Sequence, residues 1–349
     1  MNGGTIIDRS ALLAPFLALT AVALPAAAQE VTLKVHHFWP RTAMPPSIIL
    51  APWCERIAKE SNNRMRCEIY PAMQLGGTPA QLIQQAMDGV ADIVWTLPGY
   101  TAGRFPMMEV FELPFMSQSA EATSRAAWDY YTQYGFKEFP GIKALAINVH
   151  DNGYLHTVAR PVRVMADLKG LKIRAPTRQT NKLLAALGAT PVAMPLLALG
   201  DALSKRMIDG YMLPWEVIPS LKAHEFTKFE SETDPKSRAL YTAVFILAMN
   251  QAKYDSLPAD LKKVIDANSG AALSKMAGNV WDASAPSARK IAADHGNRFY
   301  TIPASELDNW HKATARLPED WMKDVAANGK DGKMLLQAAK DLISKYESK

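Results

Sequence analysis

Apolar residues recur at two spacings in the chain after its first 30 residues. In some segments every second residue is apolar, as in a strand with one buried face, and in others the spacing of three and four is that of a helix. The pattern predicts three strands, at Val31–Phe38, around Met65, Cys67 and Ile69, and at Asp92–Trp95. Two helices are predicted between these strands. The first begins at Pro45 and has Ile49, Leu50, Trp53 and Ile57 on one stripe, and the second extends from Thr78 to Gly89. Strands alternating with helices indicate a parallel sheet covered by helices.

A second block of strands and helices follows. It is predicted to contain two strands (Ala144–Val149, Leu171–Ala175), two helices (Asn181–Leu187, Ala198–Met207), a long apolar strand running back to the first block (Leu240–Met249) and, after Pro258, mostly helix. Pro286 is expected to kink or interrupt the last helical region, because proline lacks an amide hydrogen. No low-complexity linker separates the blocks, so we expect a hinge made of strands, near Asn148–Tyr154 and near Arg238–Tyr241.

The N-terminus has a different composition. Residues 11–24 form an apolar run that is short for a bilayer, which takes about 20 residues to span. Small residues follow at 25–28, so we expect a cleaved signal peptide over residues 1–28, with an uncleaved anchor as the alternative. The mature chain is then expected to be soluble and periplasmic.

The length and charge of the chain limit its class. A chain of 349 residues exceeds what one core usually organises, so two domains are expected. The net charge of +5 is spread along the sequence without a block of Lys and Arg. Nucleic-acid binding is therefore not expected, and the charge supports only a weak preference for anionic ligands.

The two cysteines agree with export. In an oxidising compartment Cys54 and Cys67 can form one disulfide that closes a short loop, and two buried thiols are the alternative. The two sulfur atoms lack the close pairing that is usual for zinc ligands.

No residue pattern specific for catalysis is found. The sequence has no Gly-x-Ser-x-Gly elbow, no Walker loop and no Gly-x-Gly-x-x-Gly after a strand. His36 and His37 are adjacent on a predicted strand, so their side chains point to opposite faces and do not share one metal. His150 and His156 are interpreted as lining or hinge residues. We expect no enzymatic activity, no cofactor and no metal.

Four segments carry the most specific pattern in the sequence. They are Asp167–Pro176 (DLKGLKIRAP), Leu187–Pro195 (LGATPVAMP), Tyr70–Gly77 (YPAMQLGG) and Met207–Gly210 (MIDG). In their identity and order they resemble the DctP family of TRAP transporter solute-binding proteins. The resemblance implies an α/β, two-domain periplasmic-binding-protein-like fold, with strands crossing a hinge and a long helix spanning both domains.

The resemblance also implies a function and a division of the chain. Proteins of this family close around a small organic acid and deliver it to TRAP membrane permease subunits driven by an ion gradient. The expected domains are residues 29–151 with 240–279, and residues 152–239 with 280–349. A periplasmic sensor subunit that binds the same ligand, and a hydrolase or lyase, are the competing classes.

Arg174, the arginine of the family's Lys-x-Arg motif, is expected to bind the ligand carboxylate. A guanidinium presents a rigid pair of donors that matches a carboxylate. A surface or interdomain ion pair is the alternative for Arg174. Sialic-acid-type members resemble this chain but carry a second arginine, and Tyr154 stands at that position here.

The other expected lining residues are mostly apolar or aromatic. They are Phe38, Trp39, Trp95, Leu97, Leu196, Leu213, Trp215 and Tyr241. One strong anion site and an aromatic lining predict an organic monocarboxylate ligand, aromatic or hydrophobic, and an aliphatic 2-oxo or hydroxy acid is the alternative. Trp215-Glu216 resembles faintly the metal-binding pair of oxoacid-binding members, but the order of residues differs, so no metal is expected.

Overall fold

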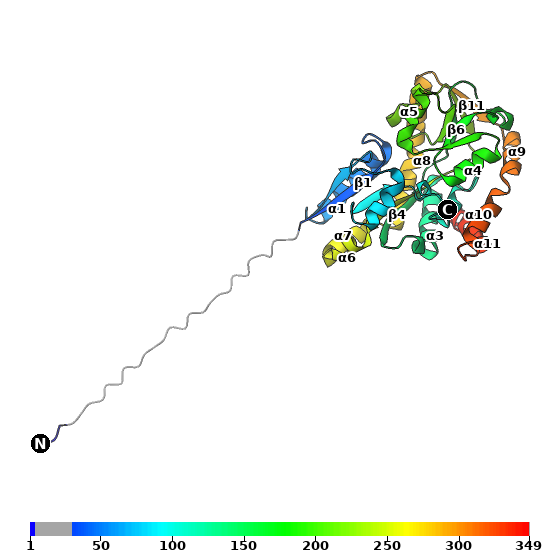
Figure 1. Cartoon of the computed structure of the whole chain (residues 1–349). Coiled ribbons are helices and arrows are strands. Elements are labelled where there is room, and N and C mark those ends of the chain that lie inside the picture. The colour runs from blue at the N-terminus through cyan, green and yellow to red at the C-terminus, as the bar shows by residue number, and fades with distance from the viewer. Residues whose placement is uncertain (4–29, 349) are drawn as a thin grey trace.

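Two mixed sheets with helices around them form the body of the molecule (Figure 1). The computed structural model describes residues 1–3 and 30–348. The predicted signal peptide falls almost entirely on residues 4–29, which lie outside the described residues. The predicted α/β architecture with two bodies is confirmed.

The first sheet has five strands, in the order β2-β1-β3-β10-β4. Strand β1 (Val31–His37) pairs in parallel with β2 (Met65–Tyr70) and β3 (Ile93–Thr96), and β10 (Val244–Asn250) lies antiparallel between β3 and β4 (Ile142–Val149). The connecting helices begin with prolines and apolar stripes, as the sequence predicts. They are α1 (Ala51–Glu60), preceded by a π-helical turn (Pro45–Leu50), and α2 (Leu82–Met87).

The second sheet has six strands, in the order β11-β9-β5-β8-β6-β7. They are β5 (Tyr154–Thr157), β6 (Lys172–Ala175), β7 (Thr190–Ala193), β8 (Gly210–Leu213), β9 (Phe229–Thr233) and β11 (Arg298–Ile302). Helix α4 (Arg178–Ala186) joins β6 to β7 and is capped by the Thr177 hydroxyl, which accepts from the Thr180 amide. Helix α5 (Leu199–Ser204) joins β7 to β8 and is shorter than the predicted helix over 198–207.

Two neighbouring segments connect a strand of one sheet directly to a strand of the other. One leads from β4 to β5, and the other leads from β9 to β10. The Gly153 amide donates to the Tyr241 carbonyl at 3.2 Å, and the Leu240 amide donates to Asn152 Oδ1 at 3.0 Å. A Cβ at Gly153 would lie 2.0 Å from the Tyr241 ring, so only glycine allows this approach. The two crossing segments are therefore hydrogen-bonded to each other.

The predicted strand over 240–249 is too long at its start. The structure has β10 from Val244, because the residues before it bond to the other crossing segment and to a nearby turn instead of a neighbouring strand. The Ala243 amide donates to His150 Nε2, and the Thr242 hydroxyl donates to the Phe111 carbonyl. Apolar residues alone do not distinguish a strand from a buried crossing segment.

A single long helix, α8 (Ala271–Asp294), runs along both bodies. It packs on α3 (Ala120–Gln133) and β4 at one end. At the other end, Arg289 forms an ion pair with Glu232 of β9. Pro286 lies inside α8 and does not interrupt it. The Ser284 hydroxyl donates to the Val280 carbonyl one turn earlier.

The remaining helices surround these layers. They are α6 (Gln251–Ser256), α7 (Ala259–Ala267), α9 (Ala304–Thr314), α10 (Leu317–Ala326) and α11 (Gly332–Glu347). Helix α11 packs against α3 (Figure 1), where Lys345 pairs with Asp129. The C-terminal helix, assigned from sequence to the second domain, therefore contacts the first sheet's body.

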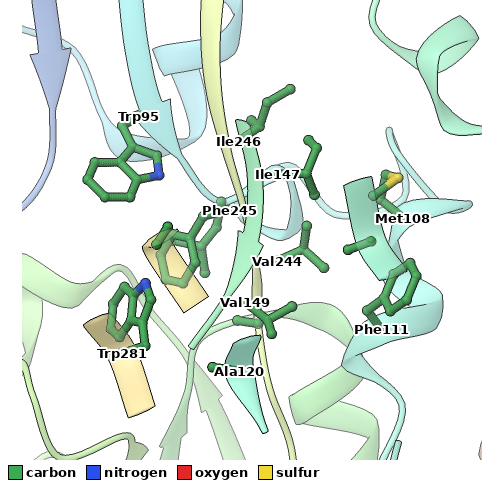
Figure 2. Packing of buried hydrophobic residues seen from close by; sticks show 14 of the residues in the cluster. Trp95, Met108, Phe111, Ala120, Ile147, Val149, Val244, Phe245, Ile246 and Trp281 are labelled. Carbon is green, nitrogen blue, oxygen red and sulfur yellow. The ribbon is translucent and has the colours of Figure 1, made fainter. Parts of the chain in front are cut away.

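Strand β10 carries buried side chains on both of its faces (Figure 2). On one side Phe245 lies near Trp95 and stacks on Trp281 of α8, with ring centroids 5.3 Å apart. On the other side Val244 and its neighbours face the turn that contains Phe111. The side of β10 that carries Phe245 is the one that reaches the candidate site.

Cys54 of α1 and Cys67 of β2 form a disulfide, which decides between the two alternatives left open by the sequence. Their sequence separation of 13 closes a short loop.

We expect the Cys54→Ala, Cys67→Ala double variant to lose about 3 kcal/mol of unfolding free energy, because the open loop gains entropy in the unfolded chain. Urea unfolding of both proteins, with and without dithiothreitol, measures this. Equal midpoints, or a reductant effect on the double variant, would contradict it.

Candidate ligand-binding site

A buried cavity of about 30 Å³ lies between the two sheets, beside the crossing segments. Its walls come from the ends of β1, β3, β6, β8 and β10, from the crossing segments and from α8. The lining residues are Phe38, Trp39, Leu97, Tyr100, His150, Arg174, Pro176, Leu196, Leu213, Pro214, Glu216, Val217, Tyr241, Ala243, Phe245 and Trp281. Most of this wall is apolar, and its few polar groups stand out.

Arg174 is the one lining residue with a permanent charge. It lies on β6 and is fully buried. Its Nε donates to the Met194 carbonyl at 3.1 Å and its Nη1 to the Met212 carbonyl at 3.3 Å. Nη2 has no hydrogen-bond partner, and Arg174 forms no ion pair within residues 1–3 and 30–348. A buried cation that is held by backbone carbonyls and keeps a free donor is suited to an anion.

Aromatic rings form a continuous wall beside the arginine. Phe38 stacks on Trp39 at 4.1 Å between centroids, and Trp39 lies 5.3 Å from Phe245. Phe245 in turn stacks on Trp281, and the Tyr100 ring meets Phe38 edge-on at 5.3 Å. These rings come from three elements of the first sheet's body and from α8, so only the tertiary fold assembles them.

Glu216 lines the cavity, and its acidic neighbour Asp151 does not. Glu216 and Asp151 are buried and hydrogen-bond to each other. Burial, and then the charge of Asp151, raise the pKa of Glu216 well above its usual value. Burial, and then the charge of Asp282, do the same to the pKa of Asp151. The pair therefore holds protons more readily than free carboxyl groups do.

His150 joins the cavity to the hinge. Its Nε2 accepts from the Ala243 amide at 3.0 Å, so the ring proton is on Nδ1, which donates to the Asp151 carbonyl at 2.5 Å. Burial is the largest cause that lowers the pKa of His150, to about 4; the hydrogen bond to the Asp151 carbonyl opposes it, and the Arg174 charge acts in the same direction as burial. The imidazole is neutral at physiological pH and adds no second positive charge.

The residues proposed from sequence fall into two groups. Seven line the cavity, namely Phe38, Trp39, Leu97, Arg174, Leu196, Leu213 and Tyr241. Three do not line it, namely Trp95, Tyr154 and Trp215. Trp95 stands behind Trp39, with ring centroids 4.9 Å apart. Trp215 turns into the second sheet's core, where its Nε1 donates to Glu232 at 2.9 Å, and Tyr154 lies beside it.

Sequence reasoning missed several lining residues. Tyr100, Phe245 and Trp281 were not singled out, and Glu216 was considered only for metal binding. The Phe245 side chain belongs to an apolar run with no visible periodicity, and Trp281 lies on a helix far along the chain. No local signal indicates that α8 crosses the cavity.

Contacts across the cleft hold the two bodies close together. Glu109, from the turn before α3, accepts hydrogen bonds from Arg178 and Gln179 at the start of α4. The Leu196 amide donates to the Tyr100 hydroxyl at 3.3 Å. A groove of about 530 Å³ opens beside them and shares Tyr100 and Pro176 with the cavity.

The described residues contain neither a cluster of metal ligands nor a helix that could span a membrane. Within 1–3 and 30–348, no group of three or more His, Cys, Asp or Glu side chains is placed to hold a metal ion. No helix in this part of the chain has the length and apolar character needed to cross a bilayer.

Comparison with known proteins identifies relatives with the same architecture. A TRAP solute-binding protein from Rhodoferax ferrireducens, solved with copurified benzoate, is 51% identical, with a TM-score of 0.90 over 91% of this chain and 99% of that one. A marine metagenome TRAP protein specific for aromatic acids, solved with 3-hydroxybenzoate, is 48% identical, with a TM-score of 0.89 over 91% and 99%. A third, from Bordetella bronchiseptica with bound mandelate, is 27% identical, with a TM-score of 0.83 over 90% and 99%.

The family assignment follows from a match to a whole-family model. Residues 37–324 match the model of the bacterial extracellular solute-binding proteins of family 7, named DctP. The matched range includes every strand of both sheets except β1, of which it includes only His37, and it also includes both crossing segments and every residue that lines the cavity. The chain therefore belongs to the DctP family of TRAP transporter solute-binding proteins.

Proposed function

We propose that this protein captures an aromatic monocarboxylate in the cavity between its two bodies and delivers it to TRAP permease subunits. The observation that carries the proposal is Arg174, a buried guanidinium with one free donor facing an apolar and aromatic wall. A carboxylate neutralises this charge, and the ring of an aromatic acid packs on the wall.

The balance of charge supports one carboxylate rather than two. Arg174 is the single cationic side chain of the lining, because His150 is neutral. A second ligand carboxylate would have no cation in the wall, which instead contains the acidic Glu216. Burying an uncompensated charge costs several kcal/mol, so dicarboxylates are disfavoured.

The ligands of the similar proteins support the aromatic class. The two solved relatives near 50% identity hold benzoate and 3-hydroxybenzoate, and the more distant one holds mandelate. All three ligands are aromatic monocarboxylates. The aromatic wall of this chain, with Phe38, Trp39, Phe245 and Trp281, offers the ring contacts that such ligands use.

The protein acts as a binder in this proposal, exported through a signal peptide over residues 1–28 to the periplasm. Calorimetric titration with benzoate is expected to give one saturable site per chain. Benzoate recovered from the complex by chromatography after prolonged incubation is expected to be unchanged. Absence of binding, or conversion of the benzoate, would refute the proposal.

We expect the two bodies to close on the ligand. The walls of the cavity come from both bodies, so the bodies separate to admit a ligand and come together around it. The crossing segments on both sides of Gly153 and Tyr241 provide the hinge, and the Tyr100–Leu196 hydrogen bond forms on closure. A Cβ at Gly99 would lie 2.7 Å from Thr177, which shows how closely the bodies meet.

Small-angle X-ray scattering with and without saturating benzoate measures this movement. The bound protein is expected to have the smaller radius of gyration. Identical scattering profiles at saturation would indicate a rigid receptor.

A further inference from the structure

The cavity has a second polar edge besides Arg174. Glu216 follows β8, Tyr241 lies in the second crossing segment, and Trp281 lies on α8. They are 5%, 1% and 1% exposed. Within the described part of the chain Tyr241 Oη and Trp281 Nε1 have no hydrogen-bond partner, and the Glu216 side chain is paired with the Asp151 carboxyl group. Polar residues from three different elements thus line one small cavity, and the two donors among them have no partner in the described residues.

These atoms are unsuited to a wall that only contacts a hydrocarbon ring. A buried polar group without a partner costs about 1–3 kcal/mol, and nearly all such groups in proteins are paired. Trp215 and Trp321 show the usual solution, since they donate to Glu232 and to the Pro106 carbonyl, and Trp95, which packs behind Trp39, is an exception. The unpaired atoms at the cavity therefore indicate a polar group on the ligand.

The chemistry of the three atoms defines that group. The Trp281 indole only donates, the Glu216 oxygen accepts, and the Tyr241 hydroxyl does either. A ligand hydroxyl both donates one hydrogen bond and accepts two, so it satisfies all three. A methyl ether only accepts, and a plain ring does neither.

We propose that Glu216, Tyr241 and Trp281 form a hydroxyl-binding subsite, so that the preferred ligand is a hydroxylated aromatic monocarboxylate. The ligand hydroxyl donates to Glu216 Oε2 and accepts from Tyr241 and Trp281, while its carboxylate binds Arg174. This inference rests on the proposed function, because it concerns the far end of the same ligand. Glu216 is thereby a specificity-determining residue.

Calorimetric titrations with benzoate, 3-hydroxybenzoate, 4-hydroxybenzoate and 3- and 4-methoxybenzoate test the subsite. At least one hydroxy isomer is expected to bind about tenfold more tightly than benzoate, and its methoxy counterpart is expected to lose this gain. Benzoate binding as tightly as both hydroxy isomers would overturn the inference and leave the proposed function intact. Failure of all five acids to bind would overturn the proposed function itself.

Variants test whether Glu216 is responsible for the higher affinity of the hydroxy isomer. In Glu216→Leu the ratio of the affinity for the preferred hydroxy isomer to the affinity for benzoate is expected to fall to near one. Glu55→Gln, on the exposed face of α1, is the control, and its affinity ratio is expected to equal that of the parent. Tyr241→Phe removes only the hydroxyl oxygen and is expected to lower the ratio at least threefold. It serves as the test if circular dichroism shows that Glu216→Leu does not fold. A ratio unchanged in the folded variants would overturn the assignment.

Discussion

Arg174→Ala is expected to weaken benzoate binding by at least about 30-fold while the protein remains folded. Truncating one partner of a buried, hydrogen-bonded charge pair costs roughly 2–5 kcal/mol, and each 1.4 kcal/mol is about a factor of ten in affinity. In the free protein Arg174 has no anionic partner, so its removal leaves no unpaired carboxylate behind in the described residues. Calorimetry measures the affinity, and circular dichroism checks the fold.

Two matched variants sharpen this test. Arg174→Lys is expected to bind benzoate nearly as poorly as Arg174→Ala, because an ammonium group does not reproduce the planar donors that contact the Met194 and Met212 carbonyls and the ligand together. Arg56→Ala, on the exposed face of α1, removes the same charge away from the cavity and is expected to bind like the parent. Parental affinity in Arg174→Ala would mean that the carboxylate binds elsewhere.

The second large effect is discrimination between ligand classes. Benzoate, phenylacetate and mandelate are expected to raise the melting temperature, and succinate and sialic acid are expected to leave it unchanged at the same concentration. Succinate brings a second charge to a lining whose only cation is Arg174, and sialic acid brings several hydroxyl groups to a wall that is mostly apolar. A ligand at 100 times its Kd adds about 2.7 kcal/mol of stability, which a thermal-shift assay resolves.

Neutral and aliphatic analogues separate the contribution of the ligand charge from that of its aromatic ring. Methyl benzoate keeps the ring without the charge and is expected to give no shift, and cyclohexanecarboxylate keeps the charge without the aromatic ring and is expected to give a smaller one. A strong shift with succinate or sialic acid alone would contradict the proposed ligand class and would require a second anion site.

The sequence predicted the parts of the fold that depend on local patterns. Strand β1, the proline at the start of the α1 region and the glycine after α4 follow from alternation and capping preferences, which act over a few residues. The start of β10 was misplaced, because residues 240–243 bond to Gly153 and His150, which lie about 90 residues away.

The candidate site was predictable where a motif carries it. Arg174 was identified from the Lys-x-Arg motif, and the structure has its guanidinium in the cavity wall. Trp215 and Tyr154 were proposed by the same resemblance, but the partner that fixes Trp215 is Glu232 of β9, and no local pattern predicts that hydrogen bond. Trp281 reaches the cavity only because α8 runs past both bodies.

A crystal structure of the protein grown with benzoate tests the central claim most directly. We expect one benzoate in the cavity between the bodies, with its carboxylate on the Arg174 guanidinium and its ring against Phe38, Phe245 and Trp281. Benzoate bound outside this cavity, or bound inside it with its carboxylate away from Arg174, would contradict the account.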